Sequence, residues 1–217
     1  MANAKIGVLG SGDVGRVLGA GLAGLGHEVK LGSREPESGK LRTWRAEAGT
    51  NASTGTFADA ARHGEVVIVA TLWTGTESAL KLAGAPRAFE GKVVMDATNP
   101  LDFSTGTPRL AVSGEDSAGE RVQRWLPGAR VVKAFNTVGN ACMVKPQFPG
   151  GPPDMFIAGN DEGAKRAVSD LAARLGWPTI DAGGIEASRY LEALAMLWIG
   201  YGLRTRTFAH AFKLLRR

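Results

Sequence analysis

The sequence contains very little cysteine and histidine, two residue types that often hold metal ions or form covalent crosslinks. Cys142 is the single cysteine among 217 residues, and there are three histidines. One cysteine excludes a disulfide framework within the chain and is typical of a reducing compartment. Three scattered histidines and one cysteine do not give the ligand spacing of a metal site. We therefore expect a cytoplasmic protein with no bound metal.

Long hydrophobic runs are also missing. The longest apolar stretch lies at about 191–203, and it is shorter than the roughly 20 residues that a bilayer-spanning helix needs. Residues 1–4 lead directly into the first expected strand, so no secretory signal peptide is predicted. Hydrophobic residues make up 44% of the sequence, which is enough to bury the core of one full domain.

The net charge of +5 comes entirely from the C-terminal residues 204–217, which contain no acidic residue. The cations of this segment are Arg204, Arg206, Lys213, Arg216 and Arg217. Such a cluster fits a patch for an anionic partner or nucleic acid. It also fits the solvated face of a terminal helix, where basic residues are favourable. We favour the helix and expect no nucleic-acid partner.

Short β-branched runs alternate with longer segments of helical periodicity along most of the chain. The expected strands are 4–9, 28–32, 51–54, 65–70, 91–96, 129–134, 154–158 and 178–181. The expected helices are 14–25, 37–48, 57–63, 75–83, 116–125 and 161–175. This alternation is typical of parallel strands joined by right-handed helical crossovers. The sequence therefore predicts an α/β fold with a Rossmann-type, doubly wound and mostly parallel sheet.

A glycine-rich motif joins the first expected strand to the first expected helix. Its residues are Gly10, Ser11, Gly12, Asp13, Val14 and Gly15. The spacing is that of a dinucleotide-binding loop, in which Gly10 permits a tight turn, Gly12 lets backbone approach a pyrophosphate, and Gly15 lets the helix pack on the strand. The helix N-terminus adds N–H groups and a positive dipole end for the phosphates. The motif alone is weak in a glycine-rich chain, but its position between strand and helix makes it specific.

The end of the second expected strand indicates which dinucleotide binds. An acidic residue is expected there when the ribose carries a free 2′-hydroxyl group. This chain instead has Ser33 and Arg34, a hydroxyl group and a guanidinium that suit a 2′-phosphate. We therefore expect NADP(H) rather than NAD(H) as the cofactor.

The C-terminal part departs from the alternating pattern, since residues 185–215 are helical in character throughout. Their wide apolar face consists of Leu191, Leu194, Leu197, Trp198 and Tyr201. We divide the chain into an NADP-binding domain at 1–183 and a helical segment at 184–217. This segment is expected to pack on the sheet or on the second subunit of a homodimer. Two segments rich in turn-forming residues, 103–116 and 145–154, are expected to be loops that border a substrate pocket.

Further candidate site residues follow the later strands, because ligands of open parallel sheets bind beyond the carboxyl ends of the strands. Thr71, Leu72 and Trp73 follow one central strand, whereas Asn99 and Asn136 follow two others. We expect Thr71 and Trp73 to flank a bound dinucleotide, although plain packing explains Trp73 equally well. Asn99 also fits a simple turn, and Asn136 also fits a loop anchor.

Titratable residues that would carry acid–base chemistry are missing at these strand ends. Asp96 lies inside a predicted strand, so a turn or capping role explains it better than catalysis. His63 precedes a strand on its amino side and should face away from the site. We expect His63, His27 and His210 at the surface.

Four stretches carry a resemblance to known proteins. They are Gly32–Arg34, Val131–Thr137, Asp154–Asn160 and Thr179–Glu192. Over roughly residues 4–203 the chain resembles the NADPH-dependent reductases of the deazaflavin coenzyme F420, and also the cytosolic oxidoreductase domain of six-transmembrane metalloreductases.

The resemblance implies direct hydride transfer between the nicotinamide of NADP(H) and a deazaflavin (F420) or flavin (FMN or FAD) ring. Such a reaction needs no nucleophile, which agrees with the missing proton donors. Ser33 and Arg34 match the family positions that hold the 2′-phosphate. The family positions that line the cofactor are matched by Thr71, Asn99, Ala134 and Asn136.

Two other functions use the same glycine motif. The first is an NADPH-dependent reductase of a small imine, ketone or hydroxy acid. Such enzymes usually add a helical substrate domain, and only about 30 residues follow the last expected strand here, so a partner subunit would have to complete the site. The second is a redox sensor that binds NADPH without turnover. The sequence favours the F420-linked or flavin-linked reductase.

Overall fold

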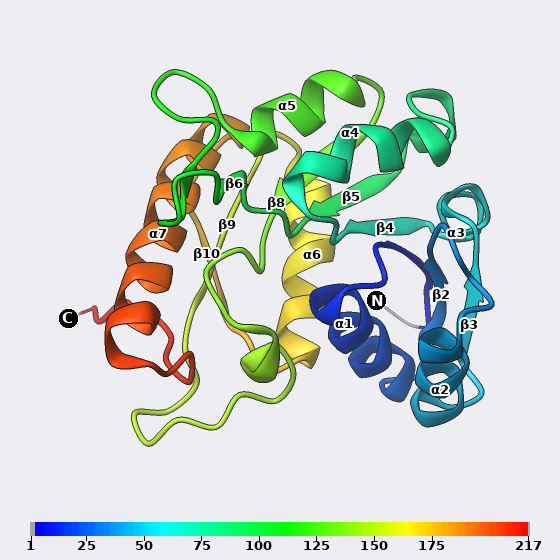
Figure 1. Cartoon of the computed structure of the whole chain (residues 1–217), viewed down its shortest axis with the longest axis horizontal. Coiled ribbons are helices and arrows are strands. Elements are labelled where there is room, and N and C mark those ends of the chain that lie inside the picture. Colours follow the sequence, from blue (N-terminus) through cyan, green and yellow to red (C-terminus); the bar gives the residue numbers. More distant parts are fainter. Residues whose placement is uncertain (1–2, 217) are drawn as a thin grey trace.

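The structure is a computed structural model that describes residues 3–216. Its centre is an eight-stranded sheet in the order β10-β9-β8-β5-β4-β1-β2-β3 (Figure 1). These strands are β1 (Lys5–Leu9), β2 (Glu28–Gly32), β3 (Ala52–Gly55), β4 (Val66–Val69), β5 (Val93–Asp96), β8 (Arg130–Lys133), β9 (Met155–Gly159) and β10 (Thr179–Asp181). Neighbouring strands are parallel except for β8 and β9, which are antiparallel. The mostly parallel Rossmann-type sheet is thus confirmed.

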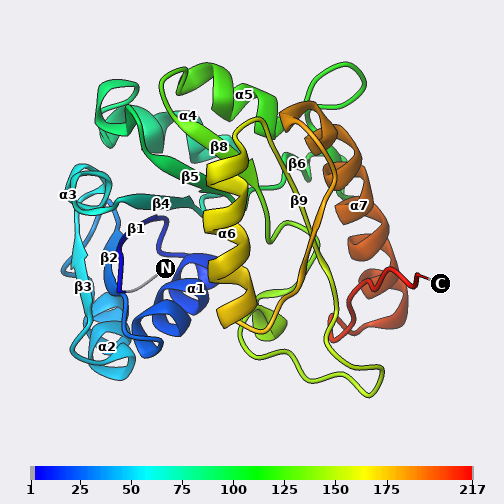
Figure 2. The same cartoon turned by 180° about the vertical axis from the view of Figure 1, so that it is seen from behind.

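Helices cover both faces of the sheet (Figures 1 and 2). On one face lie α1 (Asp13–Gly24), α2 (Gly39–Ala48) and α6 (Glu162–Arg174). On the other lie α3 (Phe57–His63), α4 (Trp73–Leu82) and α5 (Ala118–Trp125). The long helix α7 (Ser188–Thr205) contacts α5 and β9. The remaining elements are the hairpin strands β6 (Leu101–Asp102) and β7 (Arg109–Leu110), and the short 3-10 helices η1 (Arg87–Phe89), η2 (Asn140–Cys142) and η3 (Ile185–Ala187).

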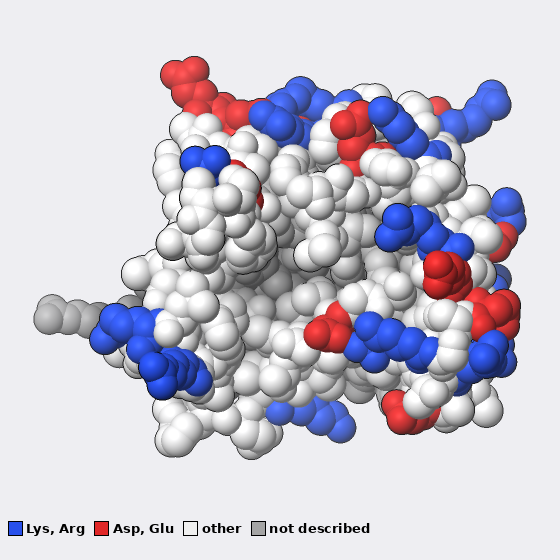
Figure 3. Space-filling view, in the orientation of Figure 1, with Lys and Arg blue, Asp and Glu red and all other residues white. Residues whose placement is uncertain are grey.

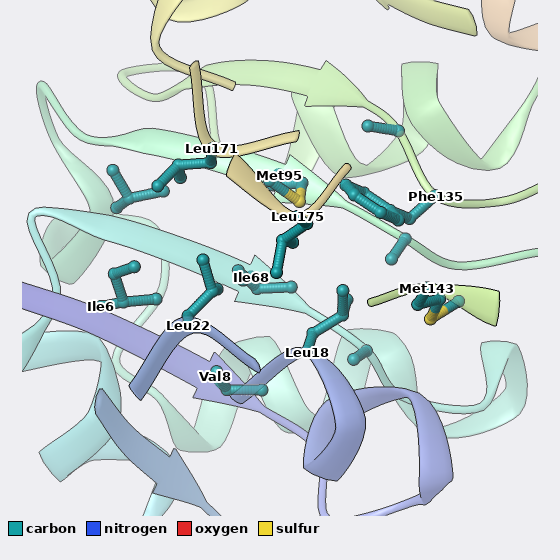
Figure 4. Close-up of a cluster of buried hydrophobic side chains, with 14 of the residues drawn as sticks. Ile6, Val8, Leu18, Leu22, Ile68, Met95, Phe135, Met143, Leu171 and Leu175 are labelled. Carbon is teal, nitrogen blue, oxygen red and sulfur yellow. The ribbon is translucent and has the colours of Figure 1, made fainter. Parts of the chain in front are cut away.

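The central strands are apolar on both sides because helices bury both faces. In β4, Val66 and Ile68 belong to the core beneath α1 and α6, whereas Val67 and Val69 belong to the core beneath α3, α4 and α5. Figure 4 shows the first of these cores, where strand residues meet the apolar stripes of two helices: Ile6, Val8, Ile68, Leu18, Leu22, Leu171 and Leu175. Burying such side chains contributes about 1.5–3 kcal/mol each. This packing fixes α1 against β1.

One segment that the sequence predicts as a loop contributes to a hairpin. Within 103–116, β7 pairs antiparallel with β6, so that Asp102 lies opposite Arg109 and Leu101 opposite Leu110. An ion pair of 2.8 Å joins Asp102 to Arg109 across the strands. Strands of two residues are too short to show an alternation of apolar and polar residues, so they could not be predicted.

From residue 206 to residue 216 the basic C-terminal segment is not helical, which contradicts the expectation of a terminal helix to residue 215. α7 ends just before Arg206, which adopts the left-handed conformation with a φ of 57°. The chain then reverses, and the Phe208 ring packs on Trp198 with ring centroids 5.2 Å apart. The Trp198 Nε1–H donates to the carbonyl oxygen of His210 at 2.9 Å. These tertiary contacts override the helical preference of the local sequence.

His27 is fully buried, whereas the sequence predicted a surface position. Its Nδ1 accepts a hydrogen bond from the backbone N–H of Ala4 at 3.1 Å, and its Nε2 lies 2.7 Å from Arg174 Nη1. Burial, together with the positive charge of Arg174, lowers the pKa of His27. Both partners of the ring, Ala4 before β1 and Arg174 at the end of α6, lie far from it in the sequence. His63 and His210 are half-buried.

Candidate cofactor-binding cleft

A cleft of about 1130 Å³ opens at the carboxyl ends of β1, β4 and β5. The strand order places β2 and β4 on opposite sides of β1, and such a reversal leaves a crevice where ligands bind in open α/β sheets. Figure 3 shows the hollow at the middle of this face, and its floor carries no Lys, Arg, Asp or Glu side chains. The volume exceeds the range typical of a pocket for one small ligand, which is about 300–1000 Å³.

The loop from β1 into α1 holds glycine at positions where the backbone requires it. Gly10 has a φ of +124°, and a Cβ atom there would overlap the carbonyl group of Ala70. A Cβ atom at Gly15 would overlap the carbonyl oxygen of Gly10. Gly12 differs, because it lines the cleft and no atom lies within 4 Å of the place where its Cβ would be. The backbone at Gly12 can therefore approach a ligand closely.

The N-terminus of α1 lies at the same end of the cleft as the glycine loop. Gly12 is the N-cap residue, and no side chain caps the helix, so the first helical N–H groups are available to a ligand. Ser11, Asp13 and Val14 line this end. Asp13 forms an ion pair with Arg16, which reduces its repulsion of an anion. These residues fit the pyrophosphate of a dinucleotide.

Ser33 and Arg34 lie beside the glycine loop at the end of β2. The buried Ser33 hydroxyl lies 3.2 Å from the Ser11 hydroxyl and accepts a hydrogen bond from the Glu35 N–H at 3.2 Å. Arg34 is exposed and lines the cleft. Lys40, which was not predicted as a site residue, lines the same end from the start of α2. Two cations and a hydroxyl group are suited to a phosphate monoester.

Residues after β4 form the next part of the wall. Thr71, Leu72 and Trp73 all line the cleft, and the Leu72 side chain is 82% exposed. The Thr71 hydroxyl lies 2.9 Å from that of Thr76 in α4. Trp73 stacks on Trp125 of α5 with ring centroids 5.5 Å apart. Trp73 thus packs on α5 and also lines the cleft, and its contact with a bound dinucleotide stays a prediction.

The structure separates Asn99 from the other residues proposed beyond β5 and β8. Asn99 lines the cleft and donates from Nδ2 to the Asn136 carbonyl oxygen at 2.7 Å. The Asn136 Nδ2 donates to Asn99 Oδ1 at 3.2 Å and to the Leu191 carbonyl oxygen of α7 at 2.9 Å. Asn136, Ala134 and Gly15 are buried outside the cleft wall. Asn136 thus ties the wall residue Asn99 to α7.

Many residues of the cleft wall were not singled out from the sequence. They include Glu35, Ser38, Phe57, Thr74, Gly75, Ser78, Leu82, Thr98, Leu101 and Asn140. Most lie a few residues beyond a strand end that had been identified, so a wider window after each strand would have found them. Asn140 belongs to η2, far along the chain, and nothing in the sequence signals its position.

The β6–β7 hairpin lies at the mouth of the cleft. Leu101 and Phe103 line the cleft from this hairpin, and Phe103 is 61% exposed. Hydrogen bonds from the backbone N–H and hydroxyl of Ser104, followed by one from Arg109, lower the pKa of Asp102 to about 2. Asp102 therefore stays ionised, and the turn keeps its hydrogen bonds, at any pH near neutrality.

Charge is unevenly distributed along the wall. Among the described residues, the charged side chains of the wall all follow β1 or β2: Asp13, Arg34, Glu35 and Lys40. Hydroxyl, amide and apolar groups line the part beyond β4 and β5. Within residues 3–216, no group of His, Cys, Asp or Glu side chains is placed to hold a metal ion. In the same range, no helix combines the length and hydropathy needed to cross a bilayer.

Comparison with known proteins agrees with this geometry. The sequence model of the family described as "NADP oxidoreductase coenzyme F420-dependent" matches residues 5–100. The chain is 33% identical to the F420-dependent NADP reductase of Methanocaldococcus jannaschii, in an alignment that covers 94% of each protein. The chain belongs to the F420-dependent NADP reductase family.

Two further relatives align with most of this chain. The crystal structure of a provisionally assigned F420-dependent NADP-reductase from Arthrobacter sp. FB24 has a TM-score of 0.92 and 38% sequence identity, and it covers 99% of this chain and 100% of its own. Metalloreductase STEAP3 of Rattus norvegicus is 31% identical over 88% of this chain, which corresponds to 36% of its own length. Both resemblances given by the sequence motifs are confirmed.

Proposed function

We propose that this member of the F420-dependent NADP reductase family is an NADP(H)-dependent oxidoreductase that exchanges a hydride with coenzyme F420. The distribution of charge in the cleft carries the proposal, because every charged residue of its described wall lies at the phosphate end. When bound, the nicotinamide would supply or accept the hydride at the neutral end, opposite a deazaflavin ring. FMN and FAD are the weaker candidates for the second ring.

The protein contributes binding, orientation and exclusion of water. The glycine loop and the α1 N-terminus hold the pyrophosphate, while Ser33 and Arg34 hold the 2′-phosphate. Thr71, Trp73 and Asn99 flank the nicotinamide end of the cleft. Such alignment is the main way in which the protein accelerates hydride transfer between two rings, since this step requires no acid–base pair from the protein.

Reduction of an imine, ketone or hydroxy acid requires a proton for the nitrogen or oxygen atom of the substrate. Beyond β4 and β5, the described wall offers hydroxyl and amide groups but no carboxylic acid, histidine, lysine or tyrosine. This part of the cleft therefore fits ring-to-ring hydride transfer better. A redox sensor would bind NADPH in the same way but would not oxidise it catalytically.

Steady-state oxidation of NADPH separates the three functions. With F420 as acceptor, we expect loss of nicotinamide absorbance together with reduction of the deazaflavin. FMN, FAD and a small cyclic imine should give much slower turnover or none. Tight NADPH binding without turnover of any acceptor would instead support the sensor, and turnover with the imine alone would support the alternative reductase.

We also propose that the segment 184–217 forms a homodimer through its helix α7 and not through the tail that follows it. Tyr190, Leu197 and Tyr201 form an exposed stripe along α7, with 75%, 63% and 45% of their surfaces accessible. Exposed apolar surface of this kind marks interaction sites. A cytoplasmic location stays a prediction that rests on the single cysteine.

Light scattering during size-exclusion chromatography tests the dimer. We expect twice the chain mass at micromolar concentration, and the chain mass for the variant Leu197→Lys, because a charge on the stripe opposes its burial. Leu215→Lys is the matched control, since Leu215 is exposed but lies in the tail. A wild-type protein with the mass of one chain contradicts this proposal.

A further inference from the structure

A buried ion cluster lies directly behind the cleft wall. Lys133, at the end of β8, places its Nζ 2.8 Å from Asp96 Oδ2 and 2.9 Å from Glu192 Oε1. The side chains of all three residues are at most 1% exposed. Two carboxylates thus surround one ammonium group, and the formal charge of the cluster is negative.

The excess negative charge is balanced by a helix terminus. Glu192 belongs to α7, and its carboxylate accepts hydrogen bonds from the backbone N–H groups of Ala118 and Gly119 at 2.9 and 3.0 Å. These groups form the positive start of α5. Burial disfavours the charged amine, but Asp96 and Glu192 outweigh this effect and raise the pKa of Lys133. Lys133 therefore stays protonated, and the cluster joins α7, α5, β8 and β5.

Stability alone does not explain such a cluster. Removing charges from water is costly, so well-packed apolar residues often stabilise a core as well as a buried ion pair does. Ion pairs and their hydrogen bonds differ from apolar contacts in having directions, and so they fix the relative positions of the elements that carry them. The effect of this cluster is therefore to hold particular backbone segments in place.

Thr98 is the direct link between the cluster and the cleft. Its N–H and hydroxyl groups donate to Asp96 Oδ1 at 2.9 and 2.7 Å, and its carbonyl oxygen accepts a hydrogen bond from Lys133 Nζ at 2.8 Å. All the polar atoms of Thr98 are thus bound by the cluster. Thr98 and Asn99 line the cleft beyond β5, and Asn136 ties Asn99 to α7.

We propose that Lys133, Asp96 and Glu192 are positioning residues that hold the Thr98–Asn99 wall against the nicotinamide end of the cleft. This inference rests on the proposed NADP(H) function and deepens it. The three residues act through Thr98 and do not touch the ligand themselves. Loosening the wall should weaken contacts with the nicotinamide while leaving the phosphate end unchanged, because that end is built from residues after β1 and β2.

Two ligands report on different parts of the cleft. NADPH should span the whole cleft, whereas 2′,5′-ADP should fill only the phosphate end. The double variant K133M/E192Q removes the tie to the Thr98 carbonyl but keeps the formal charge of the cluster. We expect NADPH to bind about five- to tenfold more weakly, and 2′,5′-ADP within about twofold of wild type, by titration calorimetry. The milder variant E192Q, which keeps Lys133, should show the same selective loss at about two- to threefold.

Lys165→Met provides the matched control. Lys165 is a buried lysine that pairs with Glu162 and Asp181 near the β10 edge of the sheet, away from the cleft wall. Its loss should change neither affinity. Equal weakening of both ligands in the cluster variants, or no change in a variant that unfolds cooperatively, overturns the positioning role. Failure of the wild-type protein to bind NADPH would instead refute the proposed function.

Discussion

Replacing Gly12 with alanine is expected to weaken NADPH binding by about 3 kcal/mol, or roughly a hundredfold, without lowering the melting temperature. The space around the missing Cβ of Gly12 is empty, so the free protein accommodates the methyl group. Its φ of −70° is also compatible with alanine. The methyl group would occupy the place where the backbone must approach the pyrophosphate. Fluorescence titration with NADPH, together with thermal unfolding, measures both quantities.

Gly24→Ala is the matched control, because Gly24 lies in the same helix and also has no atom near its missing Cβ. That variant should bind NADPH normally and gain up to about 1 kcal/mol of stability from helix propensity. Wild-type affinity in Gly12→Ala would show that the pyrophosphate does not lie against the α1 N-terminus.

Replacing Arg34 with alanine should weaken NADPH binding by about 2 kcal/mol, roughly thirtyfold, and leave NADH binding nearly unchanged. The guanidinium lines the cleft beside the buried Ser33 hydroxyl, and only NADPH offers a 2′-phosphate to this pair. Lys40 remains in place and limits the loss. Titration of the wild-type protein and of the Arg34→Ala variant with NADPH and with NADH measures the change in both dissociation constants.

Arg45→Ala serves as the control for charge alone. Arg45 is an exposed arginine of α2 outside the cleft wall, and its loss should leave both affinities unchanged. If Arg34→Ala weakened NADH as much as NADPH, the 2′-phosphate site would have to lie elsewhere.

The order of strands and helices could be predicted because each element has a strong local signal. β4 is a continuous apolar run, β5 is apolar up to its last residue, Asp96, and the apolar stripe of α1 is followed by Gly26 with a φ of +91°. The β6–β7 hairpin and the non-helical conformation of the tail after α7 could not be predicted, since both depend on contacts between residues far apart in the sequence. The chain does not continue as a helix at Phe208, because the Phe208 ring packs on the Trp198 ring.

The candidate site was predictable to the extent that strand ends define it. The glycine loop, Ser33, Arg34 and Asn99 all lie where a parallel sheet must present them. Sequence reasoning gave Asp96 a turn role, and its hydrogen bond to the Thr98 N–H agrees. The ion pair with Lys133 was not foreseen, because nothing local to either residue reveals a partner on a neighbouring strand.

The uneven charge of the cleft wall has a consequence for how this protein can evolve. Its charged wall residues lie between Asp13 and Lys40, whereas the neutral wall beyond β4 and β5 lies between Thr71 and Asn140. With the two ends of the cleft assigned as proposed, recognition of the nucleotide phosphates and choice of the second ring are encoded in separate stretches of sequence. Mutations can alter one of these properties without touching the other, so related proteins can inherit one nucleotide site while diverging in the molecule they reduce.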